Sequence, residues 1–103
     1  MIKPPNFDAS KKYRVIVTQY SGPGSQQVLD RWSFGWDNLL AQKGAVVLCV
    51  DPRGTGARGE EFRKQTYLQL GKYETIDLIE TAKYLKTLPY VNEEKIGIWG
   101  WSY

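Results

Sequence analysis

The sequence predicts an α/β fold in which three parallel strands alternate with two main helices. Three observations support this: strand-like runs at residues 13–20, 45–50 and 95–99, helical periodicity between those runs, and loops rich in glycine or proline at the strand ends. Strands that alternate with helices form parallel sheets with right-handed crossovers. The chain of 103 residues is long enough for one compact unit and no more.

Each predicted strand has its own signature. Residues 13–20 are rich in β-branched and aromatic side chains, and the loop Ser21-Gly22-Pro23-Gly24-Ser25 ends this strand. Residues 45–50 are a continuous apolar run, which is typical of a strand buried on both faces of a parallel sheet. Residues 95–99 form a short third strand that runs directly into Gly100.

Two helices are predicted between the strands. The first covers residues 32–42, where aromatic and aliphatic side chains recur near helical spacing, and Gly44 suits a left-handed C-cap. The second covers residues 71–88, with acidic side chains in its first half and lysines in its second, as the helix dipole favours. Its predicted apolar stripe recurs every three residues, at Tyr73, Ile76, Ile79, Ala82 and Leu85.

Composition and charge exclude several classes of protein. The chain is 42% hydrophobic and 14% aromatic, which is typical of a folded domain and not of a disordered one. The net charge is +3, but acidic residues interrupt the basic ones, so we expect no nucleic-acid partner. No apolar stretch approaches the length of a membrane span, and the sequence indicates no compartment.

The last four residues carry the strongest chemical motif. Gly100-Trp101-Ser102-Tyr103 supplies four of the five positions of the Gly-x-Ser-x-Gly elbow, directly after a predicted strand. This turn needs glycine because its backbone segments approach too closely for a Cβ atom, and it exposes the serine hydroxyl. From the pattern alone, Ser102 is either a nucleophile or an ordinary serine in a strand-to-loop turn.

Two other interpretations remain open at this point. Gly54, Gly56 and Gly59 form a literal G-x-G-x-x-G after a strand, as in dinucleotide-binding domains. However, Asp51-Pro52-Arg53 separates these glycines from the strand, and a charged segment follows them, so nucleotide binding is the less favoured alternative. The other alternative is a non-catalytic interaction module or a decayed remnant of an enzyme, which the absence of histidine favours.

Four segments closely resemble the prolyl oligopeptidase family (serine peptidase family S9), nearest to its dipeptidyl peptidase IV branch. They occur over essentially the whole chain, in the order and spacing of that family. The segments are Lys3-Pro4-Pro5-Asn6-Phe7-Asp8, Tyr20-Ser21-Gly22-Pro23, Asp51-Pro52-Arg53-Gly54-Thr55-Gly56 and Gly100-Trp101-Ser102-Tyr103. The resemblance implies a partial α/β-hydrolase fold with the first strand between the other two. Residues 1–103 would be the N-terminal part of its catalytic domain, ending at the nucleophile elbow.

The resemblance also implies an activity. Members of the family hydrolyse peptide bonds through an acyl-enzyme, and the dipeptidyl branch releases N-terminal dipeptides that typically carry proline or alanine second. By resemblance, Ser102 is the nucleophile, and the Tyr20 hydroxyl and the Tyr103 backbone N–H bind the oxyanion. The Tyr103 ring would line the pocket for the residue before the scissile bond. The implied partner is a peptide substrate, no metal or organic cofactor is implied, and a homodimeric parent is compatible with the family.

The chain departs from the family pattern in one respect. The acid and the histidine of the family's triad follow the nucleophile, whereas this chain has no histidine and one residue after Ser102. Asp51 and Asp77 precede Ser102, so neither is assigned as the triad acid. We therefore expect a truncated catalytic domain that is inactive by itself. Whether Met1 is a true start is left open.

Overall fold

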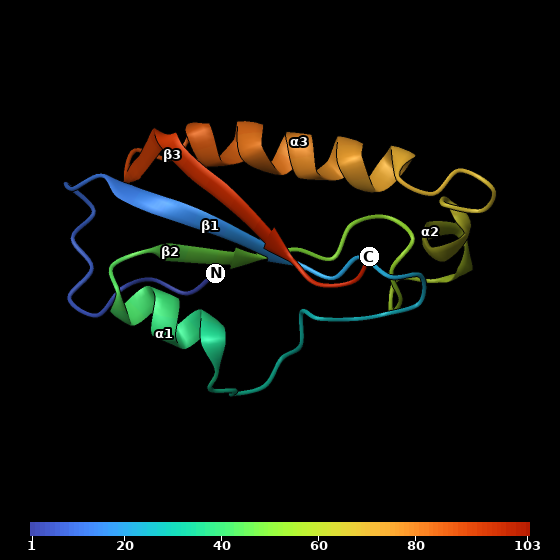
Figure 1. Ribbon diagram of the computed structural model, residues 1–103, viewed down its shortest axis with the longest axis horizontal. Helices are drawn as coiled ribbons and strands as arrows, with labels where there is room; N and C mark the ends of the chain where they lie inside the picture. Colours follow the sequence, from blue (N-terminus) through green and yellow to red (C-terminus); the bar gives the residue numbers. More distant parts are fainter.

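The computed structural model describes residues 1–103 and contains one sheet with helices along both of its sides (Figure 1). The elements follow in the order β1 (Tyr13–Gln19), α1 (Trp36–Gln42), β2 (Val46–Cys49), α2 (Glu60–Lys64), α3 (Lys72–Lys86) and β3 (Val91–Gly100). In Figure 1, α3 runs along one side of the sheet and α1 along the other, and α2 lies beyond the carboxyl ends of the strands.

The three strands are parallel and lie in the order β2-β1-β3. The register pairs Val15 of β1 with Val46 of β2 on one side and with Ile96 of β3 on the other. At the carboxyl end, Gln19 pairs with Gly100. The expected parallel α/β sheet is therefore confirmed, with the first strand in the middle.

Alternation along β1 sends its side chains to two different helices. Val15 and Val17 belong to the buried cluster that includes Leu85 of α3. Thr18 points to the opposite face, since successive strand residues alternate, and its hydroxyl donates a hydrogen bond to Asp37 of α1 at 3.3 Å. Helices α1 and α3 therefore cover opposite faces of the sheet, as is usual for parallel sheets.

The core lies between the sheet and α3. Leu85 of α3 is completely buried there, and Leu78 of the same helix packs against the cluster beside it. Apolar burial of this kind stabilises the fold by roughly 1.5–3 kcal/mol for each large aliphatic side chain. The cluster of fully buried residues consists of Val15, Val17, Val46, Leu85 and Val91.

The two edges of the sheet differ. At the outer edge of β2, Ile2 and Val47 exchange two backbone hydrogen bonds of 2.8 and 2.9 Å, so the start of the chain covers this edge. At the other edge, β3 pairs only with β1. Its side chains Ile98 and Trp99 are 61% and 51% exposed. Such an edge leaves backbone N–H and C=O groups without a strand partner.

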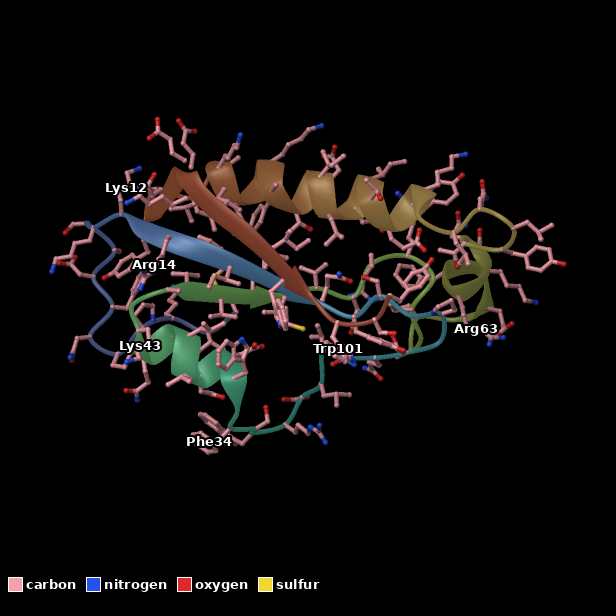
Figure 2. All side chains as sticks on the ribbon, viewed as in Figure 1. Lys12, Arg14, Phe34, Lys43, Arg63 and Trp101 are labelled. Atoms are coloured by element: carbon pink, nitrogen blue, oxygen red, sulfur yellow. The ribbon has the colours of Figure 1, made fainter.

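The first helix begins at Trp36, so the predicted start at residue 32 is wrong. Trp32 and Phe34 are 93% and 87% exposed, and Figure 2 shows Phe34 pointing away from the sheet. The reason is local: the Gly35 N–H donates to the side-chain oxygen of Asn38 at 3.0 Å, which caps the helix at this point. The aromatic spacing before Gly35 imitates a helical stripe without being one.

One further helix and one strand boundary differ from expectation. Helix α2 was not predicted, because its sequence is charged and none of its five residues is buried. Ion pairs from Glu60 to Arg63 and Lys64 link its successive turns. Strand β3 begins at Val91, four residues before the predicted start at residue 95, and Val91 is 3% exposed and pairs with Tyr13 across an irregularity in the register.

Of the predicted apolar stripe of α3, only Leu85 is fully buried. Glu74 and Leu85 are buried, whereas Ile76 and Ile79 are 40% and 50% exposed. A step of three residues falls short of the 3.6-residue helical turn, so a strict three-residue repeat drifts around the helix. The face that meets the sheet follows the longer helical period instead, from Glu74 through Leu78 to Leu85. Neither α3 nor any shorter helix is long and apolar enough to cross a membrane.

Two glycines with similar backbones occupy very different surroundings. Gly44 has φ +87° and follows α1 as the expected C-cap, and a Cβ atom there would meet nothing within 4 Å. Gly54 has φ +98°, and a Cβ atom there would lie 2.7 Å from the Thr66 hydroxyl oxygen and closer still to its methyl group. Only Gly54 combines a left-handed backbone with a crowded site.

We predict that Gly54→Ala destabilises the fold more than Gly44→Ala. Both replacements cost about 1–2 kcal/mol of left-handed strain, and Gly54→Ala adds roughly 1–3 kcal/mol of overpacking against Thr66. Urea unfolding followed by far-ultraviolet circular dichroism measures the difference. Equal losses of stability would contradict the crowded environment of Gly54.

Candidate active site

The candidate residues lie in the turns that follow β1 and β3. Gln19 pairs with Gly100, so β1 and β3 end side by side. Tyr20 follows Gln19 by one residue and Ser102 follows Gly100 by two, which places both residues at the carboxyl end of the sheet. Open α/β sheets bind their ligands at the carboxyl ends of their strands. The structure thus places Tyr20, Ser102 and Tyr103 at the carboxyl ends of the strands, where such sites form.

Ser102 lies at the centre of a tight turn. Its φ is +70°, and the Tyr103 N–H donates a hydrogen bond of 3.0 Å to the Trp101 carbonyl oxygen across it. A positive φ is uncommon outside glycine, and residues held in this way cluster at functional sites. The chain enters the turn through Gly100, where a Cβ atom would press on the Gln19 side chain and lie 3.1 Å from the Gln19 carbonyl oxygen.

A second serine provides an internal comparison. Ser21 follows β1 as Ser102 follows β3, two residues past the strand end, and its φ is +63°. Ser21 is 3% exposed, and its hydroxyl donates to the Gln19 side-chain oxygen. Ser102 is exposed, and its hydroxyl has no protein partner. Of these two serines, only Ser102 presents a free hydroxyl at the carboxyl end of its strand.

Ser102 and Tyr103 line a common hollow of about 470 Å³ between the end of β1 and the first turns of α3. Tyr20 lies instead in a neighbouring hollow of about 740 Å³ on the α1 face, together with Trp99 and Trp101. Trp101 is 75% exposed at the end of β3 (Figure 2). The structure brings Ser102 and Tyr103 into one hollow and Tyr20 into the adjacent one.

Tyr103 contacts a residue that the sequence analysis missed. Its phenol donates a hydrogen bond of 2.5 Å to Glu74 Oε1 in the first turn of α3, and Glu74 is 4% exposed. Burial and then the bond to the Glu74 carboxyl raise the pKa of the Tyr103 phenol above its ordinary value of about 10. The spacing along α3 could have indicated that Glu74 is buried. Glu74 shares a helix face with Leu78 and Leu85, which lie four and eleven residues further along the chain.

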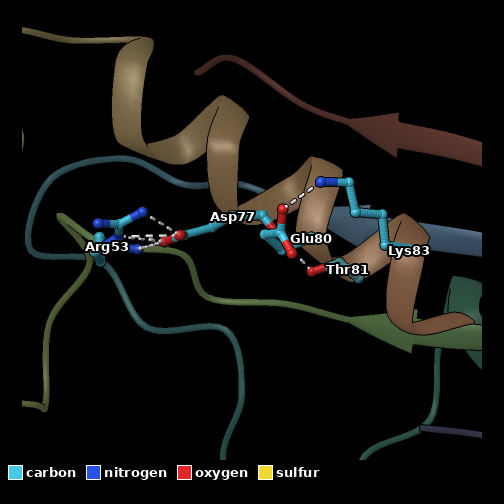
Figure 3. A network of polar contacts seen from close by, with 5 residues as sticks. All are labelled: Arg53, Asp77, Glu80, Thr81 and Lys83. Carbon is cyan, nitrogen blue, oxygen red and sulfur yellow. Dashed lines mark hydrogen bonds and ion pairs between the residues drawn. The ribbon is translucent and has the colours of Figure 1, made fainter.

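An ion pair holds the loop after β2 against α3 (Figure 3). The Arg53 guanidinium donates to Asp77 Oδ1 through Nη2 at 2.7 Å and Nε at 2.9 Å, and the Arg53 backbone N–H donates to Oδ2 at 2.8 Å. The guanidinium also lies over the Tyr73 ring, 4.6 Å from its centroid. Burial alone would raise the pKa of Asp77, but the hydrogen bonds and charge of Arg53 outweigh it and lower that pKa.

Asp51 and Asp77, the two aspartates that precede Ser102 in the chain, both have structural partners. Asp77 is engaged by Arg53, and Asp51 accepts the backbone N–H groups of Gln27 at 3.0 Å and Val28 at 2.8 Å. Neither aspartate lines the hollow that contains Ser102. Their contacts tie loops together, in agreement with their exclusion from the triad.

The glycine-rich loop uses its N–H groups internally. Gly54 donates to the Phe62 carbonyl oxygen at 3.1 Å, and Gly56 donates to the Ser25 carbonyl oxygen at 2.7 Å. A phosphate-binding loop needs such N–H groups free to face its ligand. The structure thus gives no support to the nucleotide-binding alternative. It also contains no group of three or more cysteine, aspartate or glutamate side chains that could hold a metal ion.

Comparisons with known proteins agree with this architecture. A sequence profile described as the prolyl oligopeptidase family matches residues 32–103. The probable dipeptidyl-aminopeptidase B of Grosmannia clavigera is 46% identical over 102 residues, covering 98% of this chain and 10% of its own. The prolyl endopeptidase FAP of Mus musculus is 42% identical over 104 residues, covering 100% and 14%. The crystal structure of Porphyromonas gingivalis dipeptidyl peptidase 4 superposes with a TM-score of 0.93 at 61% identity, covering 97% and 14%.

The chain belongs to the prolyl oligopeptidase family, a family of serine peptidases. Its similarity to the dipeptidyl peptidases confirms the α/β fold and the resemblance to their branch. The chain spans between 10% and 14% of the length of these relatives.

We predict that Asp77→Asn destabilises the fold at neutral pH by about 1.5–3 kcal/mol, the range for a hydrogen bond to a charged group. Because the folded pKa of Asp77 is lowered, its contribution is present above its unfolded pKa of about 3.9 and is lost as the pH falls through the folded value. The difference between wild type and variant should therefore shrink below about pH 4. Urea unfolding at a series of pH values measures it.

Glu80→Gln is the matched control on the same helix. Glu80 forms an ion pair with Lys83, but both side chains are more than 60% exposed. Exposed pairs contribute about 0–1 kcal/mol. A Glu80→Gln loss as large as that of Asp77→Asn would show that the contact with Arg53 is not special.

Proposed function

We propose that residues 1–103 are the part of a serine-peptidase catalytic domain that carries its nucleophile, Ser102. One observation carries the proposal: Ser102 is an exposed serine held at φ +70° in the turn directly after a parallel strand. A strained turn at this place lifts the serine hydroxyl above the sheet edge, as in a nucleophile elbow. Membership in a family of serine peptidases supports peptide-bond hydrolysis as the reaction.

In the proposed reaction, Ser102 Oγ attacks the peptide carbonyl carbon while a general base takes its proton. The carbonyl oxygen becomes an oxyanion, which accepts hydrogen bonds from the Tyr20 hydroxyl and the Tyr103 backbone N–H. The base then protonates the leaving amine, and the C–N bond breaks. Water hydrolyses the resulting ester by the reverse proton transfers and restores the Ser102 hydroxyl.

The two proposed oxyanion donors differ in whether they already donate a hydrogen bond within the protein. The Tyr20 hydroxyl donates to no protein group, and its ring packs over Gly22, where a Cβ atom would lie 2.9 Å from the ring Cζ. The Tyr103 N–H, in contrast, already donates a hydrogen bond to the Trp101 carbonyl oxygen. During the reaction, this N–H would exchange the Trp101 carbonyl oxygen for the oxyanion as its acceptor.

The general base must come from outside these residues. The chain contains no histidine, and the carboxylates of Asp51 and Asp77 are held by loop contacts. We therefore assign the histidine and its orienting acid to a longer protein that contains this segment. The 103-residue chain by itself is expected to be inactive, because an unassisted serine hydroxyl is a weak nucleophile.

The proposed substrate is a peptide whose N-terminal dipeptide is released. The relatives named dipeptidyl-aminopeptidase and dipeptidyl peptidase support this choice. The Tyr103 ring would line the pocket for the residue before the scissile bond, since Tyr103 shares a hollow with Ser102. Family resemblance favours proline or alanine at that position.

We predict that Ser102→Ala in the full-length protein lowers kcat for a proline-dipeptide amide by at least about 10⁴-fold, because the acyl-enzyme cannot form. Ser21→Ala removes a hydroxyl from the equivalent position after β1 and should cost less than about tenfold. Steady-state kinetics of the two variants measures the contrast. A Ser102→Ala protein with near wild-type kcat would contradict the assignment of the nucleophile.

We predict that Tyr20→Phe lowers kcat by roughly 10²- to 10³-fold with little change in KM, the effect of removing one oxyanion donor. Tyr84→Phe is the control, since Tyr84 lies on α3 and is 55% exposed. The comparison uses the same proline-dipeptide amide. If Tyr20→Phe raised KM and left kcat unchanged, Tyr20 would be a substrate-binding residue and not an oxyanion donor.

A further inference from the structure

Glu74 is a buried carboxyl group with a single partner. It is 4% exposed, its Oε1 accepts the Tyr103 phenol, and its Oε2 is buried without a hydrogen-bond partner. It forms no ion pair with any basic side chain. Burial of a carboxylate that lacks a full set of partners is costly, so Glu74 does not serve the stability of the core.

The position of Glu74 in α3 makes its contact unusual. It is the third residue of the helix, where a glutamate side chain commonly folds back onto the backbone N–H of its own N-cap. Glu74 reaches instead to Tyr103, 29 residues further along the chain. The amino-terminal end of the helix dipole partly offsets the cost of its charge there.

The contact joins α3 to the turn that carries Ser102. Tyr103 follows Ser102 directly, and its N–H closes the turn by donating to the Trp101 carbonyl oxygen. Its phenol donates a hydrogen bond to Glu74, so both the backbone and the side chain of Tyr103 are held in place. Ser102, Tyr103 and Glu74 also line the same hollow.

We propose that Glu74 is a positioning residue for the nucleophile: through the Tyr103 phenol it fixes the turn that holds Ser102 at φ +70° in the hollow. The inference rests on the proposed function of Ser102. Glu74 need not touch the substrate. Its effect reaches the hydroxyl through one hydrogen bond and one peptide unit, and a small displacement of a reacting group costs about a hundredfold in rate.

The test is a double-mutant cycle in the full-length protein. Glu74→Ala and Tyr103→Phe should each lower kcat by roughly 10- to 100-fold with little change in KM. The double variant should be no slower than either single variant, because all three remove the same bond. Glu74→Gln keeps an acceptor oxygen and should recover part of the rate. The rate of covalent labelling of Ser102 by a fluorophosphonate should fall in parallel with kcat, since that probe does not depend on the peptide pocket.

Glu80→Gln and Tyr84→Phe are matched controls on α3 and should leave both rates unchanged, because both residues are exposed. Additive losses in the cycle, or a fall in melting temperature with unchanged kcat per labelled site, would overturn the proposal. If Glu74→Ala fails to fold, Tyr103→Phe and Glu74→Gln decide the matter, and wild-type kcat in both would overturn it.

Hydrogen exchange of the peptide spanning residues 100–103 separates this inference from the proposed function. Release of the Tyr103 ring should raise exchange there equally in Glu74→Ala and Tyr103→Phe, whether or not the protein hydrolyses peptides. Unchanged exchange overturns the positioning role. A wild-type protein that is neither labelled at Ser102 nor active overturns the proposed function, and the exchange result stands independently of it.

Discussion

The parallel pairing of β1 with β3 determines where both turns of the candidate site lie. Because Gln19 and Gly100 are in register, the turns that follow β1 and β3 lie side by side at the carboxyl end of the sheet. The two turns carry the two positive-φ serines, and only Ser102 exposes its hydroxyl. A slip of one residue in this register would send every β3 side chain to the opposite face and move the Ser102 turn away from the end of β1.

Helix α3 connects this pairing to the rest of the site. It packs on the sheet through Leu85 near its carboxyl end, and its amino-terminal half carries the polar contacts. Asp77 holds the loop after β2 through Arg53, and Glu74 holds the turn after β3 through Tyr103. One helix thereby positions the loops that follow the two outer strands of the sheet, β2 and β3.

Sequence patterns predicted the architecture but not every boundary. The order of strands and helices was sufficient for the parallel sheet, because crossover rules restrict the topology. The start of α1 was wrong because Trp32 and Phe34 imitate a stripe that Gly35 interrupts. Glu74 was missed because a glutamate in the first turn of a helix usually reflects the dipole. Its burial depends on Tyr103, and no local pattern reveals a contact between residues 29 positions apart.

The positions of Ser102 and Tyr103 were predicted by motif and resemblance, and the structure adds the backbone conformation and the hollow that they share. The most direct test is to label the full-length protein with a fluorophosphonate, digest it, and locate the adduct by tandem mass spectrometry. We predict one adduct, on Ser102. An adduct on another serine, or none on a protein that cleaves dipeptide amides, would contradict it.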